Sequence, residues 1–384
     1  GFMRKRQEEK KSRINICFFS GDITRSGGTE RVACMIANGL CRYREFRVSV
    51  LSLVEQDPER QTFFDLDERI PHRALLNRQI QPGPEYAALI PVLRRFFIKR
   101  KIDVVIDIDI VLDVLSVPAA CGMRTKVISW EHFNFTYETA RRYGYRDLIV
   151  RHLTTKADVI VTLTQKDRQA FLRGLSKQGN TQKRMPEIRT IPNPIQNLPL
   201  QETAEKKRWI VTVGRLTYQK GVDYLLRTAR IVLKKYPDWQ WLLLGDGDQK
   251  EWLRGQIQKY HLQQRLLVKG NVTDVDSYLA KAQIFVLTSR WEGLPMCLLE
   301  AKAHRLACVS FAIETGPDEV ITDRYNGYLV SAFDCAKMAR RIGTLIENEQ
   351  LRRTLMKNAE KGIEKFQMES ILNQWNEVLK DLCV

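Results

Sequence analysis

The chain has 384 residues, of which 44% are hydrophobic and 28% are charged. This length exceeds a typical single core and predicts two domains, while the composition excludes disordered, collagen-like and disulfide-scaffold proteins. The net charge of +17 is concentrated in residues 1–195, which carry 34 Lys and Arg against 22 Asp and Glu. A positive electrostatic field of this kind would attract nucleic acid, an anionic membrane surface or phosphorylated substrates. The absence of any nucleic-acid-binding motif disfavours nucleic acid.

Three features bear on where the protein works. The weakly charged stretch 103–123 is interrupted by Asp107, Asp109 and Asp113, which would be costly in hydrocarbon, so no segment reads as a spanning helix. The eight cysteines show no Cys-x-x-Cys pair and the five histidines show no ligand spacing, which predicts reduced thiols and no metal site. The basic run 4–11 lacks the apolar region of a signal peptide. We therefore expect a cytoplasmic protein.

Short β-branched runs alternate with helical patterns, which is typical of α/β proteins with parallel sheets built from βαβ units. In the first half, assigned to a domain of residues 12–192, the expected strands are 14–19, 48–53, 103–106, 126–130 and 158–162. The prolines that follow Ile191 predict a linker at 193–207. A second doubly wound domain is expected at 208–366, with strands at 209–213, 240–244, 266–269, 284–288, 307–310 and 327–330.

Three helical patterns close the chain, at 335–347, 349–364 and 369–382. The last segment, 367–384, is expected to cross back to the first domain. Because ligands bind beyond the carboxyl ends of the strands in open α/β sheets, two such domains predict a site in a cleft between them.

Two loops carry groups suited to phosphate. After the first strand, Gly27 and Gly28 open a helix whose free N–H groups favour an anion, although a tight turn without a ligand fits the same residues. After the first strand of the second domain, Arg215 and Lys220 share one loop and would together suit a diphosphate; two solvated surface cations are the alternative. Gly245-Asp246-Gly247 is an ordinary turn by itself.

The stretch 289–300 is the most informative. Pro295 fits a first helical turn, so Leu294 and Met296 would offer backbone N–H groups to a phosphate. Glu292 and Glu300 suit neutral sugar hydroxyls, because a carboxylate is repelled by a phosphate. A helix-start acid and an exposed glutamate are the alternative interpretation.

Taken in order and spacing, these motifs resemble the retaining family-4 glycosyltransferases of GT-B fold. The similarity rests on the Gly-Gly loop, the Gly-Arg-Leu…Lys-Gly loop, Gly-Asp-Gly and Glu-x7-Glu, and it continues through 315–321 and 326–330. It implies two Rossmann-like domains facing each other across a cleft. It also implies transfer of a sugar with retention from a nucleotide-diphosphate donor to a glycan acceptor, one linked to polyprenyl diphosphate, in surface-polysaccharide synthesis. UDP is the preferred nucleotide, and GDP stays open.

The resemblance also implies roles for individual residues. Arg215 and Lys220 match the donor-diphosphate cations, Glu292 the residue at the donor sugar, Glu300 the ribose ligand, and Gly28 a loop glycine facing the donor phosphate. His132 matches a histidine near the reacting sugar or acceptor, with a satisfied strand-end histidine as the alternative. The loop containing Asn271 and Val272 is expected to bind the base of the nucleotide. No metal and no other cofactor is implied, because cations of the protein replace the metal.

Two further patterns remain open. Asp107-Ile108-Asp109 has the Asp-x-Asp form of metal sites in the GT-A fold, and strand alternation would place both carboxylates on one face; an acceptor-side role or a buried pair is favoured instead. The stretch 89–102 is an amphipathic basic helix that either packs on the sheet or also meets an anionic membrane. Two other functions stay open: a nucleotide-sugar epimerase of the same fold and a non-catalytic binder of anionic surfaces or nucleic acid.

Overall fold

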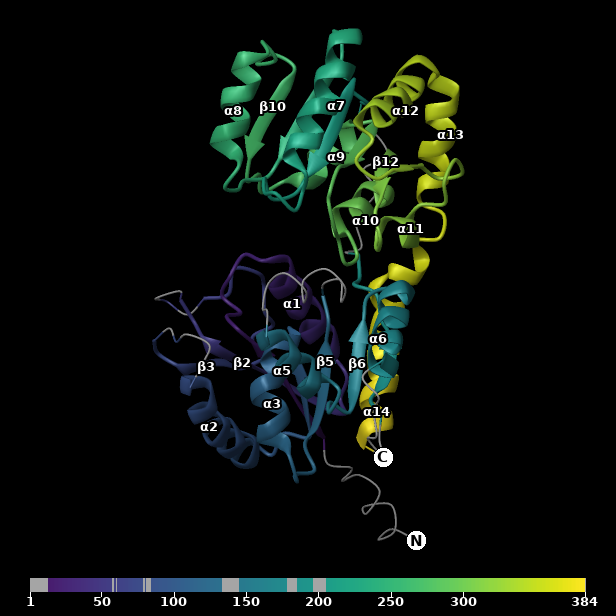
Figure 1. Cartoon of the computed structure of the whole chain (residues 1–384). Coiled ribbons are helices and arrows are strands. Elements are labelled where there is room, and N and C mark those ends of the chain that lie inside the picture. Colours follow the sequence, from purple (N-terminus) through teal and green to yellow (C-terminus); the bar gives the residue numbers. More distant parts are fainter. Residues whose placement is uncertain are drawn as a thin grey trace. The chain divides into compact units, whose positions relative to one another are not determined.

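The computed structural model divides into two compact units (Figure 1). Unit 1 comprises Gly1–Pro194 and Met368–Val384, and unit 2 comprises Ile195–Gln367. The residues that the structure describes are 13–56, 59, 61–78, 80, 84–132, 145–177, 185–195 and 205–383.

Unit 1 contains a seven-stranded sheet in the order β3-β2-β1-β4-β5-β6-β7, with every pair parallel. This order confirms the predicted doubly wound arrangement, because the strands run outward in both directions from the middle of the sheet. The strands are β1 (Ile14–Ser20), β2 (Phe46–Val54), β3 (His72–Leu76), β4 (Val104–Asp107), β5 (Lys126–Trp130), β6 (Val159–Thr162) and β7 (Glu187–Thr190).

Two of these seven strands, β3 and β7, were not among the five expected from the sequence, and both lie at edges of the sheet. β3 lies at the edge of the sheet, and its five residues are HRALL, none of them fully buried. An edge strand with a polar outer face needs no continuous apolar run, so the signal that marks the central strands is absent from it.

The helices of unit 1 connect these strands. They are α1 (Gly28–Leu40), α2 (Pro84–Arg100), the 3-10 helix η1 (Ile110–Leu112), α3 (Asp113–Ala120), α5 (Tyr145–Thr154), α6 (Gln165–Lys177) and α14 (Met368–Cys383). Of these, α2 packs on α3 and α3 on α5, whereas α1 packs on α14.

The final helix α14 is held in unit 1 by an aromatic contact and by ion pairs. The Trp375 ring lies 4.9 Å from the Trp130 ring of β5, centroid to centroid, and Trp375 is fully buried. The Asp381 carboxylate lies 2.7 Å from the Arg189 guanidinium of β7. The last helix therefore contributes to the core that the first half of the chain builds.

Unit 2 contains a six-stranded parallel sheet in the order β10-β9-β8-β11-β12-β13. Its strands are β8 (Trp209–Val213), β9 (Gln240–Leu244), β10 (Leu266–Gly270), β11 (Ile284–Leu287), β12 (Ala307–Ala312) and β13 (Tyr328–Ser331). Its helices are α7 (Val222–Lys235), α8 (Lys250–Lys259), α9 (Val275–Lys281), α10 (Met296–Ala303), α11 (Pro317–Val320), α12 (Cys335–Glu347), α13 (Glu349–Ala359) and the 3-10 helix η2 (Glu364–Phe366).

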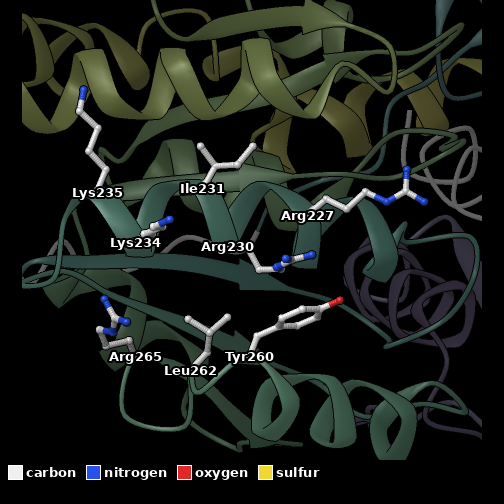
Figure 2. Close-up of a pocket in the computed structure, with 8 residues that line it drawn as sticks. All are labelled: Arg227, Arg230, Ile231, Lys234, Lys235, Tyr260, Leu262 and Arg265. Atoms are coloured by element: carbon white, nitrogen blue, oxygen red, sulfur yellow. The ribbon is translucent and has the colours of Figure 1, made fainter.

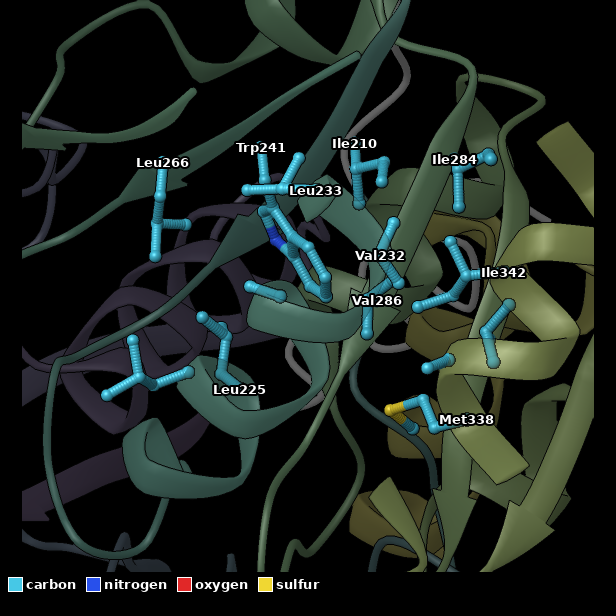
Figure 3. Close-up of a cluster of buried hydrophobic side chains, with 14 of the residues drawn as sticks. Ile210, Leu225, Val232, Leu233, Trp241, Leu266, Ile284, Val286, Met338 and Ile342 are labelled. Atoms are coloured by element: carbon cyan, nitrogen blue, oxygen red, sulfur yellow. The ribbon is translucent and has the colours of Figure 1, made fainter. Parts of the chain in front are cut away.

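The main core of unit 2 lies between its sheet and the helices α7 and α12 (Figure 3). Ile210 and Trp241 from the strands meet Val232 of α7 and Ile342 of α12, and all four are at most 1% exposed. This packing gives the carboxyl ends of the strands, where the candidate donor residues lie, a rigid base.

Candidate active site

The strand order of unit 2 reverses between β8 and β11, which are neighbours in the sheet. In doubly wound sheets this switch point separates the loops that leave the two strands and opens a crevice for a ligand. The loop after β8 carries Arg215 and Lys220, and the loop after β11 carries Glu292. The fold therefore places three predicted site residues at one switch point.

Lys220 and Glu292 form an ion pair across this switch point. The Lys220 Nζ lies 2.6 Å from the Glu292 Oε1, and the two side chains are 20% and 7% exposed. Burial by itself lowers the pKa of Lys220, but the neighbouring Glu292 carboxylate raises it, and the net shift is upward. Lys220 is therefore a fixed positive charge, and the Glu292 carboxylate is its partner.

Two residues that the sequence analysis did not assign a role hold Glu292 in place. The Ser289 hydroxyl donates to the Glu292 Oε1 at 2.5 Å, and the Thr315 hydroxyl donates to the Glu292 carbonyl oxygen at 2.8 Å. Gly316 next to it has a φ of +105°, and a Cβ there would overlap the Gly293 carbonyl. The turn after β12 is thus packed against the Glu292 loop, which explains why a Thr-Gly pair occurs there.

The Gly245-Asp246-Gly247 turn is part of the same site. The Leu216 N–H donates to the Asp246 carbonyl oxygen at 2.9 Å, so this turn braces the loop of Arg215. Gly245 has a φ of +150°, and a Cβ there would overlap the Gly214 carbonyl. The interpretation as an ordinary turn misses this packing, which only the adjacency of β8 and β9 reveals.

Helix α10 begins beside Glu292. Pro295 is its N-cap rather than a residue of the first turn, and no side chain caps the helix. Met296 is thus the first helical residue, Leu294 is buried just before it, and Glu300 lies one turn inside the helix, partly exposed. Burial raises the pKa of Cys297 to about 12, so this thiol stays protonated beside the site and supplies no thiolate nucleophile.

The remaining donor-side candidates are accessible. Arg215 is exposed, and its charge acts to lower the pKa of Lys220, against the raising effect of Glu292. Asn271 is exposed and Val272 is half-buried directly after β10. Both follow Gly270, whose carbonyl oxygen accepts from the Gly245 N–H at 2.8 Å. The loop that contains them is therefore joined to the Gly-Asp-Gly turn.

Gly28 and His132, the other two candidates, belong to unit 1. Gly28 is exposed at the first position of α1. His132 follows β5, is 8% exposed, and contacts the Trp130 ring at 4.3 Å between ring centroids, with the two rings tilted by 46°. Burial lowers the pKa of His132 to about 3. The imidazole is therefore neutral, and among the described residues its Nε2 is left without a hydrogen-bond partner.

The Asp-x-Asp pair is arranged differently from the strand alternation expected for it. β4 ends at Asp107, and Asp109 instead caps η1, where its carboxylate accepts from the Val111 N–H at 3.1 Å. Asp107 pairs with Asp113, six residues further on. The two carboxylates of the motif are therefore not presented together on one strand face.

Asp107 and Asp113 are both fully buried. The Asp113 Oδ2 accepts hydroxyl hydrogen bonds from Ser129 at 2.6 Å and Thr154 at 2.5 Å, and Ser116 donates to Asp107. Burial raises the pKa of Asp107 well above its usual range and that of Asp113 to about 6. A proton retained by Asp107 and shared with Asp113 keeps the pair from carrying two negative charges in the core.

This pair makes a pH-dependent contribution to stability. Because the folded-state pKa values are raised, the contribution is complete below the unfolded pKa of about 4 and is lost as the pH rises through about 6 and above. Between pH 5 and 7 the wild type should lose stability relative to Asp107→Asn by up to about 1.4 kcal/mol per pH unit, since the amide never ionises. Urea unfolding at several pH values measures the difference, with Glu68→Gln at an exposed position as a control that keeps the wild-type slope. Parallel curves for wild type and Asp107→Asn would contradict the shared proton.

Within the described ranges, no cluster of three or more His, Cys, Asp or Glu side chains is placed to hold a metal ion. Among the same residues, no helix combines the length and the apolar character needed to cross a bilayer.

Comparisons with known proteins agree with this geometry. The family model described as "Glycosyl transferases group 1" matches residues 197–362, and that described as "Glycosyltransferase Family 4" matches residues 26–196. An uncharacterized glycosyltransferase of Haemophilus influenzae is 29% identical over 365 residues, covering 95% of this chain and 99% of the relative. A GalNAc-α-(1→4)-GalNAc-α-(1→3)-diNAcBac-PP-undecaprenol α-1,4-N-acetyl-D-galactosaminyltransferase of Campylobacter jejuni is 23% identical, covering 93% of this chain and 96% of the relative.

Among solved structures, HepE of Anabaena in complex with UDP-glucose has a TM-score of 0.76 at 20% identity. The match covers 95% of this chain and 99% of that one. At this identity the likeness bears on the fold alone, and it agrees with two doubly wound units. The two family models between them span most of both units, and the chain belongs to the family-4 glycosyltransferases of GT-B fold.

Proposed function

We propose that the protein transfers a sugar, with retention of anomeric configuration, from a UDP-sugar to a lipid-linked glycan acceptor on the cytoplasmic side of a membrane. The observation that carries the proposal is the buried ion pair between Lys220 and Glu292 at the switch point, beside the exposed Arg215. Two cations next to the uncapped start of α10 form a site for a diphosphate.

The chemistry follows from where charge develops. When the sugar leaves its nucleotide, negative charge grows on the β-phosphate, and fixed donors stabilise that charge without reorganising. Lys220 and Arg215 supply the positive charge, and Glu292 is left to face sugar hydroxyls. The departing phosphate accepts the acceptor proton on the face it leaves, which accounts for retention without a dedicated base. The neutral His132 and the Gly28 loop are assigned to the sugar or acceptor and to the donor phosphate, and Glu300 to the ribose.

Relatives support the choice of substrates. The C. jejuni enzyme is named for an undecaprenyl-diphosphate-linked saccharide, and HepE is seen with UDP-glucose. UDP and a polyprenyl-diphosphate-linked acceptor are therefore the first compounds to assay, with GDP-sugars as the second series.

The exposed face of α2 supports the proposal that the protein binds to a membrane surface. Val92 and Ile98 are 43% and 60% exposed, and they alternate with the exposed cations Arg95, Lys99 and Arg100. An exposed helix face of this kind suits an anionic bilayer surface. Arg94 is excluded from it, because its guanidinium donates to the Cys121 carbonyl oxygen at 2.7 Å.

The proposal predicts sugar transfer that persists in EDTA, because protein cations occupy the role of a metal. The test incubates UDP-sugars with a polyprenyl-diphosphate-linked saccharide, follows nucleotide release with and without acceptor, and determines the new anomeric linkage by NMR. Loss of transfer in EDTA that Mn²⁺ or Mg²⁺ restores would contradict metal independence. Nucleotide-sugar conversion that needs no acceptor would favour an epimerase, and an inverted linkage would overturn retention.

A further inference from the structure

A second basic surface lies in unit 2, separate from the donor loops. It is a hollow of about 850 Å³ (Figure 2), here called the basic hollow, and it is lined by Arg227, Arg230, Ile231, Lys234, Lys235, Tyr260, Leu262 and Arg265. Helix α7 supplies one side, and the chain between α8 and β10 supplies the other.

The basic hollow faces away from the catalytic edge of the sheet. α7 starts at the carboxyl end of β8, beside Lys220, and ends before the amino end of β9. Lys234 and Lys235 close that helix, and Arg265 directly precedes β10. Because the strands are parallel, these three cations lie at the amino edge of the sheet, opposite the loops that bind the donor.

The buried and the basic residues of α7 lie on different faces of the helix. Its buried residues include Leu225, Ala229, Val232 and Leu233. Arg227, Arg230, Ile231 and Lys234 follow the spacing i, i+3, i+4, i+7, which places them on one face of the helix. Cations in the last turn offset the helix dipole, but this explains Lys234 and Lys235 only, and not the arginines further back.

Much of this charge is uncompensated. The Lys235 Nζ lies 2.8 Å from a Glu347 oxygen, and an Arg227 nitrogen lies 3.9 Å from an Asp223 oxygen. In the part of the chain that the structure describes, Arg230, Lys234 and Arg265 have no carboxylate within 4.0 Å. The basic hollow therefore holds three cations that no acidic side chain of the described residues neutralises.

Two of these cations are also fixed in position. The Arg230 guanidinium lies 3.5 Å from the centroid of the Tyr260 ring, a cation–π contact. The Arg265 guanidinium donates to the carbonyl oxygen of Leu233. An anion that binds here meets guanidinium groups whose side-chain entropy is already reduced.

Apolar side chains accompany the cations. Ile231 lies within the basic hollow and is 49% exposed. Tyr260 also lines the basic hollow and is partly exposed. A soluble polyanion gains little from an exposed isoleucine beside a tyrosine ring, whereas a bilayer interface accepts both apolar and cationic side chains.

We propose that the basic hollow binds the phosphate head groups of anionic lipids, so that unit 2 has a membrane contact of its own. It is a different surface from α2 and from the donor loops. It rests on the proposed function only in that the acceptor there is lipid-linked.

The experiment measures partition of the full chain onto vesicles of two parts phosphatidylcholine to one part phosphatidylglycerol, without donor or acceptor. Arg230→Glu/Lys234→Glu should weaken partition by at least about 25-fold, because each cation near an anionic surface contributes about a factor of five. The matched control, Arg353→Glu/Lys357→Glu on the exposed face of α13, makes the same change in net charge and should stay within about twofold, since distant charges are screened at 0.1 M salt.

Further arms of the experiment distinguish lipid binding from binding of a soluble polyanion and from damage to the donor site. Ile231→Ser should weaken partition onto the vesicles but leave binding to dextran sulfate unchanged. Thermal stabilisation by UDP should be the same in Arg230→Glu/Lys234→Glu as in the wild type, so failure of donor binding is seen separately. Arg95→Glu/Lys99→Glu on α2 reports on the membrane contact of the proposed function.

Wild-type partition by Arg230→Glu/Lys234→Glu would overturn the inference, even if the α2 variant loses binding. Equal loss in the α13 control would overturn it as well, because the effect would then be one of net charge. Binding to dextran sulfate that depends on Arg230 and Lys234, without vesicle binding, would replace the lipid with a soluble polyanion.

Discussion

Lys220→Ala should abolish measurable transfer and also destabilise the protein by about 3–5 kcal/mol. The stability loss follows from the Glu292 carboxylate, which is 7% exposed and would stay in place without its partner. The activity loss follows from the missing positive charge at the donor diphosphate, and one such group contributes about 10²–10³ in rate.

A double substitution separates the two effects. Lys220→Ala/Glu292→Ala removes both charges and should recover most of the stability in urea unfolding, but none of the activity. Lys235→Ala serves as the control, because its ion pair with Glu347 joins side chains that are 65% and 56% exposed and should contribute less than about 1 kcal/mol. A stable and active Lys220→Ala would remove Lys220 from the site.

Arg215→Ala should reduce kcat by about 10²–10³ while leaving the melting temperature unchanged. Arg215 is exposed, so its side chain adds little to the core, and surface substitutions of this kind stay within about 0.5 kcal/mol. Steady-state kinetics with a saturating donor gives the rate, and thermal unfolding gives the stability.

Two comparisons sharpen the Arg215 result. Arg215→Lys keeps the charge but loses the planar fork, so it should recover only part of the rate. Arg254→Ala on α8, also exposed, should behave as the wild type. A rate within tenfold of the wild type for Arg215→Ala would assign the diphosphate to other groups.

The loops of the donor site were predictable because parallel strands deliver their carboxyl ends to one edge. Arg215, Lys220 and Glu292 each follow an apolar run, and that pattern alone places them at the edge of the sheet. Their pairing was not predictable, since Lys220 and Glu292 are 72 residues apart and meet only because β8 and β11 are neighbours. Thr315 was missed for a similar reason, since it is 23 residues from Glu292, whereas Ser289 lies only three residues before Glu292 and was simply not assigned a role.

The Asp-x-Asp motif shows where alternation along a strand fails. A strand that continued through Asp109 would have placed Asp107 and Asp109 together. β4 instead ends at Asp107, and the chain enters η1 and then α3, which brings Asp113 back onto Asp107. Where a strand ends depends on its partners in the sheet, and local sequence does not report them.

The return of α14 to unit 1 has a consequence for the order of folding during synthesis. The chain leaves unit 1 after Pro194, builds all of unit 2, and returns at Met368. A ribosome releases the first segments of unit 1 before unit 2, but the Trp375 that packs on Trp130 emerges only after all of unit 2 has been made. Unit 2 is one continuous segment, so its core can form while unit 1 still exposes the surface on which α14 will pack. The domain that is made first is therefore the last to be completed. Until α14 arrives, the apolar surface of unit 1 that includes Trp130 stays exposed, and such a surface on a nascent chain favours aggregation and binding by chaperones.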